Sequence, residues 1–384
     1  MDRCTSLSRR LRTEPWSWNH LSAMVLAMCA AAPAVACQLQ TVAVLHLEMN
    51  GNSPLVDVSI NGQPARMLID TGAQASLLTR PAALAYNLEL RALEGVTIYG
   101  VGGYDVSDRV VIDDFQLGTL KVHKVQLFVA GRHGFGQAAG LLGENILSRW
   151  DAEFDFAHGA VRLFQPKGCS GDEVVYWGGG YSVSQLQSSA QTGYIQTVLE
   201  LNGNKTLALW DSGAYVSTVT TDAARLAGVA LHSDDVQKSG HARGIGSNEV
   251  DSYVTVFSTF KVGDEQIQNA KLRIADLFGA NKSTPTFTRI PRDITQVPGM
   301  LLGADFFLSH RIYVARSQNK VYFSYAGGPV FSTREPEVRE EEGDKGGGQD
   351  GASQNTADSS ASQAQPSDGK TDAAPASESG KPRG

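Results

Sequence analysis

The sequence predicts an all-β protein, mainly β with short helices, built from two similar lobes that pair about a pseudo-two-fold axis. Three observations lead to this fold class. Asn-Gly dipeptides, which favour type I′ hairpin turns, divide alternating apolar segments at 61–62 and 202–203. The 40 glycines among 384 residues suit a turn-rich β protein better than a helical bundle. Finally, the first half of the chain reappears in the second half.

The repeat indicates an internal duplication. Without a gap, it aligns SINGQPARMLIDTGAQASLLTRPAALAYNL with ELNGNKTLALWDSGAYVSTVTTDAARLAGV, which places Asp70 on Asp211. Further along, YGVGGYDV (99–106) matches RGIGSNEV (243–250). Finally, GLLGENILSRWDAEF matches GMLLGADFFLSHRIYV. The order of these segments is the same in both halves.

Each copy is expected to hold the same local structures. A hairpin turns at each Asn-Gly, and the Ala-rich segments 79–88 and 220–229 predict short helices with Pro81 and Asp222 in their first turns. A second pair of strands is expected around 117–119 in one copy and around 262–264 in the other.

The composition divides the chain into five parts. We expect a signal peptide at 1–36, a first lobe at 37–176, a Gly/Ser/Gln-rich linker at 177–193, a second lobe at 194–334 and a disordered acidic tail at 335–384. The tail holds 11 acidic and 5 basic side chains, and its only large apolar residue is Val338, so it cannot bury enough surface to offset the ordering entropy.

The charge excludes one class of function. The formal net charge is −7, and the middle of the chain has no dense Lys/Arg run. Nucleic-acid binding through a basic patch is therefore not expected.

The N-terminus predicts export. Four arginines (Arg3, Arg9, Arg10 and Arg12) precede the apolar stretch 21–32, and Ala34 and Ala36 form an A-x-A cleavage motif. The stretch is too short to span a bilayer, so no stable membrane insertion is expected after cleavage. The mature protein is expected to be periplasmic or secreted. An N-terminal membrane anchor is the alternative.

Two cysteines remain after signal cleavage. Cys4 and Cys29 leave with the signal, whereas Cys37 and Cys169 stay in a compartment that is expected to be oxidising. A disulfide between Cys37 and Cys169 is the favoured interpretation. The alternative is a lipoprotein acylated at Cys37, which "AVAC" supports poorly because Ala34 stands where a bulky aliphatic residue is usual.

Each copy offers one aspartate on a glycine turn at the end of an apolar strand. If the two lobes pack face to face, Asp70 and Asp211 meet at their boundary. Two close carboxylates cannot both ionise cheaply, so one holds a proton. The ionised member can activate a water and the protonated member can polarise a carbonyl group. Gly72 and Gly213 would let the two backbones approach, and Thr71 and Ser212 could bond across the boundary.

These motifs resemble the retropepsin-like aspartic proteases. The residues that carry the resemblance are Asp-Thr/Ser-Gly-Ala after an apolar strand, a glycine-rich hairpin about thirty residues later, and Leu-Leu-Gly-x-Asp/Asn. The chain looks like a bacterial exported member with two such units, over roughly residues 40–330.

The resemblance implies roles for specific residues. Asp70 and Asp211 would be the catalytic pair, and the Leu-Leu-Gly segments at 141–143 and 301–303 would be strands behind the active-site loops. The loops would be supported by Thr71, Gly72, Ala73, Ser212, Gly213 and Ala214. Two flaps would close over an extended peptide with Gly100, Val101, Gly102 and Gly103 in one and Gly244, Ile245 and Gly246 in the other.

Three departures stand out. The second flap is more polar than the first, and the second copy has an insertion at 281–298 that is expected either to cap the cleft or to contact a partner. Ala73 and Ala214 occupy positions where pepsin-like enzymes usually have Ser or Thr. A hydroxyl there would donate to the carboxylate, so its absence predicts higher pKa values for the pair and a pH optimum of about 5–7 rather than 2–3.

The predicted function is that of an exported aspartic endopeptidase, whose partner is a peptide or protein substrate. No metal or organic cofactor is implied, and His133, His158, His232 and His241 lack metal-ligand spacing. Pairing of the lobes within a monomer is favoured, and pairing between two molecules in a dimer is the alternative. A peptide-binding protein on the same fold, with weak or lost catalysis, is the second hypothesis.

Overall fold

The structure is a computed structural model that describes residues 37–131, 135–171, 174–187, 193–244, 248–279 and 297–331. The predicted signal peptide, the acidic tail, most of the insertion and two residues of the second flap, Ile245 and Gly246, lie outside these ranges. In the described ranges, no helix has the length and hydropathy that spanning a bilayer requires.

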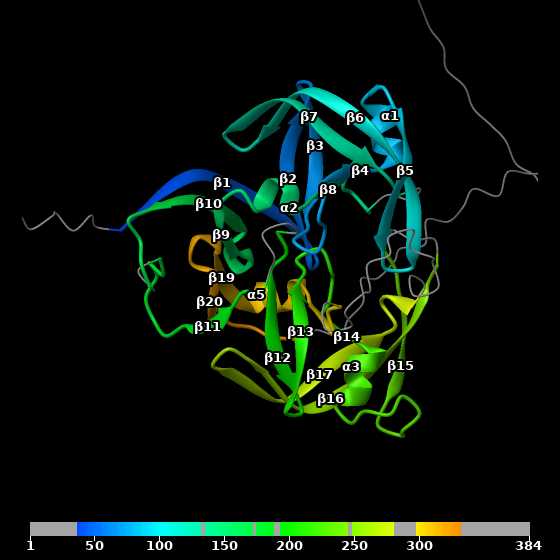
Figure 1. The fold of residues 1–384 in the computed structure, drawn as a ribbon, viewed down its shortest axis with the longest axis vertical. Coiled ribbons are helices and arrows are strands. Elements are labelled where there is room, and N and C mark those ends of the chain that lie inside the picture. Colours follow the sequence, from blue (N-terminus) through cyan, green and yellow to red (C-terminus); the bar gives the residue numbers. More distant parts are fainter. Residues whose placement is uncertain are drawn as a thin grey trace, which may run out of the picture. The chain divides into compact units, whose positions relative to one another are not determined.

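Two sets of elements follow one another in the same order (Figure 1). The first set is β1 (Gln38–Asn50), β2 (Ser53–Ile60), β3 (Gln63–Ile69), β4 (Leu77–Leu78), α1 (Arg80–Ala85), β5 (Arg91–Gly100), β6 (Gly103–Leu117), β7 (Leu120–Val129), β8 (Gly140–Leu142), α2 (Glu144–Leu147), β9 (Asp151–Asp155), the 3₁₀ turn η1 (Phe156–His158) and β10 (Ala160–Lys167).

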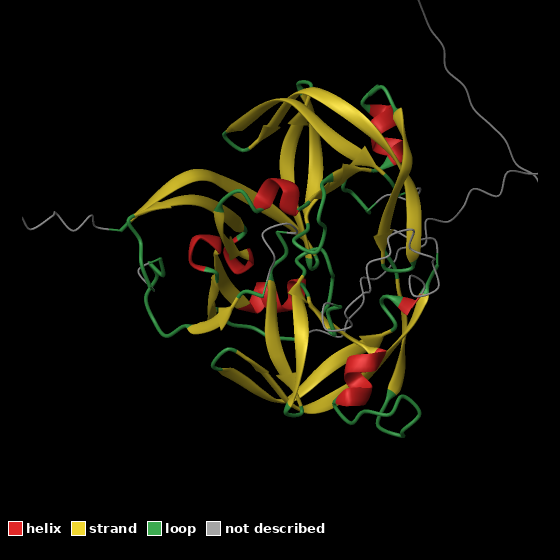
Figure 2. Cartoon of the chain, in the orientation of Figure 1, coloured by secondary structure: helices red, strands yellow, loops and turns green. Residues whose placement is uncertain are grey.

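The second set repeats this series and begins with β11 (Ser182–Gln185), which pairs with the last strand of the set as β1 pairs with β10. It comprises β12 (Gln196–Leu201), β13 (Asn204–Trp210), β14 (Thr218–Thr220), α3 (Thr221–Leu226), β15 (Gln237–Ala242), β16 (Val250–Val262), β17 (Glu265–Ala275), β18 (Met300–Leu302), α5 (Ala304–Ser309), β19 (His310–Ala315), η3 (Arg316–Gln318) and β20 (Lys320–Tyr325). The described chain is mostly strand with short helices, which confirms the predicted fold class (Figure 2).

The Asn-Gly hairpins form as predicted. Asn61 and Gly62 have φ values of 50° and 82°, and Asn202 and Gly203 have 49° and 77°. Positive φ at both central positions is what a type I′ turn needs, and Asn and Gly tolerate it best. These turns set the register of β2 with β3 and of β12 with β13.

The two short helices also form where the sequence predicts them. Thr79 and Thr220 are their N-caps, and each hydroxyl accepts a hydrogen bond at 3.2 Å from the backbone N–H three residues on. Pro81 lies in the first turn of α1 and Asp222 in the first turn of α3. Both residue types suit the first turn of a helix.

Each Leu-Leu-Gly segment is a short strand beside the strand that leads to the aspartate. β8 runs parallel to β3, with Leu141 paired to Leu68, and antiparallel to β4. β18 makes the same contacts with β13 and β14, and Leu301 is paired to Leu209. This arrangement confirms that the segments lie behind the aspartate loops.

The two lobes share the six antiparallel strands β11-β20-β19-β9-β10-β1, which form one end of a 13-stranded sheet. At its centre β9 pairs with β19, so that Ala152 lies opposite Val314 and Phe154 opposite Ile312. Because β9 and β19 are equivalent strands of the repeat, this register is the one that a pseudo-two-fold axis between them requires.

Part of the segment predicted as a linker belongs to this sheet. Residues 182–185 form β11, which pairs with β20 at the edge of the sheet. Just before it, Trp177 Nε1 donates to Ser324 Oγ at 2.9 Å. Four residues between glycines and serines carry too weak a pattern to predict a strand.

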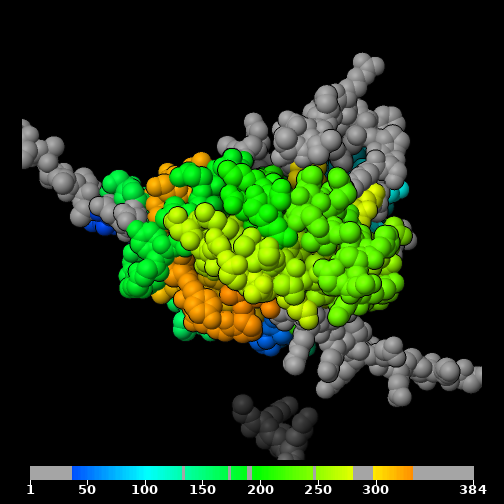
Figure 3. Space-filling model, turned by 90° about the horizontal axis from the view of Figure 1, so that it is seen from below, coloured from blue at the N-terminus to red at the C-terminus, as the bar shows by residue number. Residues whose placement is uncertain are grey.

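One face of the shared sheet packs into the aromatic core of the molecule. Phe154 and Phe307 lie edge to face with ring centroids 5.4 Å apart, and Trp210 and Phe306 are also 5.4 Å apart. Phe331 and Phe260 lie edge to face with ring centroids 5.0 Å apart. Figure 3 shows the orange end of the described chain against the yellow-green part of the second lobe.

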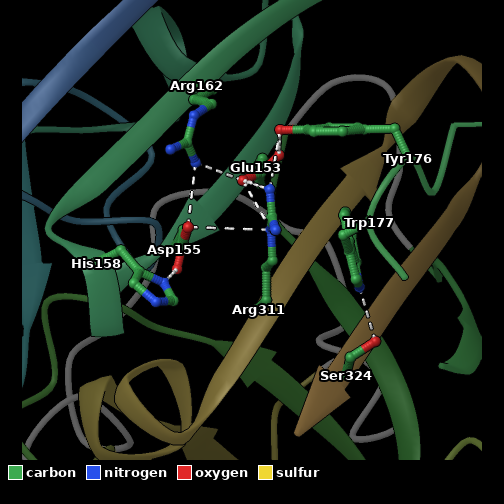
Figure 4. A network of polar contacts seen from close by, with 8 residues as sticks. All are labelled: Glu153, Asp155, His158, Arg162, Tyr176, Trp177, Arg311 and Ser324. Carbon is green, nitrogen blue, oxygen red and sulfur yellow. Dashed lines mark hydrogen bonds and ion pairs between the residues drawn. The ribbon is translucent and has the colours of Figure 1, made fainter. Parts of the chain in front are cut away.

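The other face holds a buried network of charges that joins the lobes (Figure 4). The Glu153 carboxylate is fully buried and accepts hydrogen bonds from Arg162 Nη1 at 2.6 Å and Arg311 Nε at 3.0 Å. Tyr176 donates to the same carboxylate, and Asp155 pairs with Arg162 at 3.2 Å. Buried charges of this kind persist only when they are paired and hydrogen-bonded.

Cys37 and Cys169 form a disulfide, as predicted. It joins the residue before β1 to the segment after β10, beside the pairing of Gln38 with Lys167. A disulfide at Cys37 favours the cross-link over lipid attachment at that residue.

Candidate active site

The two predicted aspartates lie at equivalent strand ends. The Asp70 N–H donates to the Leu142 carbonyl oxygen at 2.9 Å, and the Asp211 N–H donates to the Leu302 carbonyl oxygen at 2.8 Å. The Leu-Leu-Gly strands therefore fix the point at which each aspartate loop leaves its sheet. The two carboxyl groups meet at the boundary of the lobes, where each lies against the glycine of the other loop, and the charge of Asp211 raises the pKa of Asp70.

Thr71 and Ser212 lock the two loops together. The Thr71 hydroxyl donates to the Trp210 carbonyl oxygen at 2.6 Å and accepts from the Ser212 N–H at 2.9 Å. The Ser212 hydroxyl donates to the Ile69 carbonyl oxygen at 2.8 Å and accepts from the Thr71 N–H at 3.1 Å. All of these bonds cross from one lobe to the other, so each loop is held by its counterpart.

Gly72 and Gly213 are required by the closeness of the loops. A Cβ atom on Gly72 would lie 2.2 Å from Asp211 Cγ, and one on Gly213 would lie 2.4 Å from Asp70 Cγ. Neither carboxyl can move aside without leaving its partner. Only glycine fits at these positions.

The two carboxyls are electrostatically unequal. Burial, the charge of Asp211 and the hydrogen bond to Asp211 together hold the pKa of Asp70 well above its ordinary value. Burial also raises the pKa of Asp211, but the backbone N–H groups of Ala214 and Gly213, both 3.0 Å from Asp211 Oδ1, oppose this rise. Asp70 Oδ1 accepts from one such group, the Gly72 N–H at 3.0 Å, so the two N–H groups at Asp211 favour Asp211 as the ionised member of the pair.

A second layer supports each aspartate loop in the same way. Ser76 donates to Asn145 Oδ1 from its N–H at 2.8 Å and from its hydroxyl at 2.7 Å. Ser217 donates to Asp305 Oδ1 at 2.8 Å and 2.6 Å. Because both contacts use only an oxygen acceptor, Asn in one lobe and Asp in the other serve equally well.

An apolar cluster lies on each side of the aspartate pair. Ala73 packs against the cluster in the first lobe, and Ala214 against the one in the second. The first cluster is formed by Leu55, Leu68, Leu77, Ala130, Ala138 and Leu141. The second is formed by Leu209, Ala275, Leu277 and Leu301. The cluster members themselves are buried, and partly buried apolar side chains pack against them, among them Ile98 and Phe128 on one side and Tyr194 and Val250 on the other.

The first predicted flap reaches the second apolar cluster. Strands β5 and β6 form the first flap, whose tip runs from Gly100 to Gly103 and brings Val101 to the second apolar cluster. The Gly102 carbonyl oxygen accepts the Asn248 N–H at 3.0 Å, so the first flap touches the second. Of the second flap's predicted residues, only Gly244 lies in a described range, and a Cβ there would lie 2.8 Å from Val101 Cβ.

Sequence reasoning missed three further residues near the pair. Tyr194 lies close enough to both aspartates that their charges, after burial, raise its pKa. Glu144, at the start of α2, is buried and pairs with Arg316 at 2.6 Å. The signal that could have found Glu144 is the difference between the copies, because Ala304 takes the equivalent place in the repeat.

The arrangement suits acid–base chemistry by two carboxyls. In the described residues, no group of three or more His, Cys, Asp or Glu side chains is placed to hold a metal ion. One proton on a close carboxyl pair gives an acid and a base that face the same point.

A duplicated β lobe that contributes one carboxyl from each copy defines the class of acid-protease folds. The family model described as aspartyl protease matches residues 56–146 and 197–306, once in each lobe. The chain therefore belongs to the aspartyl protease family, with two tandem retropepsin-like units. A search of curated proteins found no match.

Proposed function

We propose that the protein is an aspartic endopeptidase whose catalytic residues, Asp70 and Asp211, come from the two lobes of one chain. The observation that carries the proposal is the meeting of these carboxyls, each against the glycine of the opposite loop, at a boundary held by Thr71 and Ser212. The match of each lobe to the aspartyl protease family supports it.

The difference between the two carboxyls assigns the role of acid to Asp70 and the role of base to Asp211. A water held between them loses a proton to Asp211 as its oxygen attacks the peptide carbonyl carbon, and Asp70 gives its proton to the carbonyl oxygen. In the second step Asp211 donates its new proton to the amide nitrogen, Asp70 takes a proton from a hydroxyl of the tetrahedral carbon, and the C–N bond breaks. The pair returns to its starting state.

The substrate is an extended peptide with apolar side chains on both sides of the cleaved bond. The apolar clusters that flank Ala73 and Ala214 support this, because burying an apolar side chain contributes about 1.5–3 kcal/mol. The flap around Gly102 closes over the peptide backbone.

The protein acts as an exported monomer. The bridge between Cys37 and Cys169 supports an oxidising compartment, where disulfides persist. The buried pairing of Glu153 with Arg311 across the lobes supports a dyad formed within one chain.

Cleavage of a diverse peptide mixture between about pH 3 and pH 8 tests the proposal. The mature chain from Cys37 should cut peptides, whereas Asp70→Asn and Asp211→Asn, which preserve shape, should each lose all cuts. If the folded wild-type protein binds peptides but cuts none at any pH, the proposal is wrong and a peptide-binding function takes its place.

A further inference from the structure

One side of the aspartate pair carries a buried ion pair that the other side lacks. The Glu144 N–H donates to the Ala73 carbonyl oxygen at 2.9 Å, directly behind the first aspartate loop. Its Oε2 accepts from Arg316 Nη2 at 2.6 Å. The equivalent positions of the other copy hold Ala304, at the start of α5, and Phe156, at the start of η1. The Glu144–Arg316 ion pair is therefore an asymmetric feature of a site that is otherwise duplicated.

The ion pair fixes the backbone that enters the second lobe. Arg316 Nη1 donates to the Gly193 carbonyl oxygen at 2.6 Å. Gly193 has φ of +69° and lies so close to α2 that a Cβ on it would be 3.0 Å from Ser148 Oγ. Glu144 and Arg316 thus hold the residue that immediately precedes Tyr194.

Tyr194 packs against the same apolar cluster as the first flap and the second aspartate loop. Its half-buried ring packs against the apolar cluster of the second lobe, which Val101 of the first flap and Ala214 also contact. The charges of Asp70 and Asp211 both raise the pKa of its hydroxyl. The equivalent residue of the first copy is Ser53, whose side chain offers no ring.

The environment of Glu144 is unusual for a carboxyl group. Glu144 is fully buried, and among the described residues its Oε1 has no hydrogen-bond partner. Burial raises the pKa of Glu144 to about 7, against the lowering effect of Arg316. The charge of Glu144 also raises the pKa of Tyr194, and the charge of Arg316 also acts on Asp151, which accepts hydrogen bonds from Ser317. Burying a carboxyl oxygen without a hydrogen-bond partner is unfavourable, so we infer that Glu144 has a functional role as well as a packing role.

We propose that Tyr194 is a specificity-determining residue that contacts the bound peptide on one side of the aspartate pair only, and that Glu144 and Arg316 are positioning residues that hold it there. This inference rests on the proposed peptidase function. Tyr194 supplies a flat aromatic surface, whereas Ser53 supplies none, so the two halves of the cleft select different side chains. A peptide consequently binds in one preferred direction.

Cleavage profiles of a peptide mixture test the role of Tyr194. Tyr194→Ala should lower kcat/KM for peptides with an aromatic or large aliphatic side chain on one side of the cut by about tenfold or more. Tyr194→Phe should keep the preference, and Ser53→Ala, the matched control, should leave the profile unchanged. A Tyr194→Ala profile equal to that of wild type would overturn the proposal.

Steady-state kinetics test the positioning role of the ion pair. Glu144→Gln should raise KM about three- to tenfold with kcat within about twofold, because the dyad itself is untouched. It should also remove any change of KM near pH 7 in the wild type. A Glu144→Gln variant that loses kcat with KM unchanged would contradict the positioning role.

Hydrogen exchange separates this inference from the proposed function. Glu144→Gln and Arg316→Gln should both speed amide exchange in residues 193–199, relative to wild type and to the exposed control Glu89→Gln. Unchanged exchange overturns the positioning role even if the enzyme is active. If the wild type cuts no peptide, the proposed function fails, and peptide binding by wild type and Tyr194→Ala decides the specificity role instead.

Discussion

Thr71 and Ser212 hold each other reciprocally across the boundary of the lobes, because each hydroxyl accepts the other residue's N–H, at 2.9 Å and 3.1 Å. Each hydroxyl also donates to a carbonyl oxygen of the opposite lobe. Both residues are buried, so no water replaces a lost partner. The relative position of the aspartates depends on these bonds.

Removing one hydroxyl should therefore weaken both stability and activity. Thr71→Val keeps the shape but leaves the Ser212 N–H and the Trp210 carbonyl oxygen unpaired, which should cost about 2–4 kcal/mol of unfolding free energy. Thr71→Ser, the matched control, should keep most of both. Urea unfolding and peptide cleavage measure the effect. A Thr71→Val protein of wild-type stability would show that the lobes are held elsewhere.

Gly72 should tolerate no side chain. In Gly72→Ala the new Cβ would lie 2.2 Å from Asp211 Cγ, so the carboxyls must separate and kcat should fall by at least about a hundredfold. Gly178→Ala is the control, because a Cβ there meets nothing within 4 Å. An active Gly72→Ala enzyme would mean that the catalytic arrangement differs from the one described.

The pH dependence of cleavage should reflect the raised pKa values of the pair. Catalysis needs one proton on the pair, and both Asp70 and Asp211 have raised pKa values, so the active window moves to higher pH. We expect an optimum of about pH 5–7. Ala73→Ser, which adds a hydroxyl donor, should lower the optimum. A wild-type rate that peaks near about pH 3 would contradict this account of the pair.

Glu144 should make the protein less stable as pH rises. Its pKa goes from the ordinary 4.5 to about 7 on folding, so the folded state binds its proton more tightly. The contribution is fully present below about pH 4.5 and is lost as pH rises through about 7, a change of about 2–3 kcal/mol between pH 5 and pH 8. Urea unfolding at both pH values should show this loss in wild type and in Glu89→Gln, but not in Glu144→Gln. Equal pH slopes in all three proteins would refute the assignment.

The sequence was sufficient to predict the duplicated parts of the fold. The Asn-Gly turns, the Thr-capped helices and the Leu-Leu-Gly strands depend on local residue chemistry, and the repeat brought Asp70 and Asp211 into register. The duplication also predicted that the two lobes meet, with one aspartate from each lobe at their boundary. These predictions needed only short-range signals and a comparison of the two halves.

The shared sheet could not be predicted in the same way. Strand β9 alternates Asp151, Glu153 and Asp155 with apolar residues, a pattern typical of a strand with one face in water. All three acids are buried instead, because Arg162 from the neighbouring strand and Arg311 from the other lobe neutralise the charges of Glu153 and Asp155. Pairing between residues so far apart in the chain leaves no local signal.

The measurement that most directly tests a dyad shared by two lobes of one chain is peptide cleavage by Asp70→Asn, by Asp211→Asn and by an equimolar mixture of the two. If each molecule builds its own pair, both variants are inactive and the mixture is inactive as well. If lobes pair between molecules, some assemblies in the mixture combine an intact Asp70 with an intact Asp211, and activity returns. Recovery of cleavage in the mixture would contradict the account.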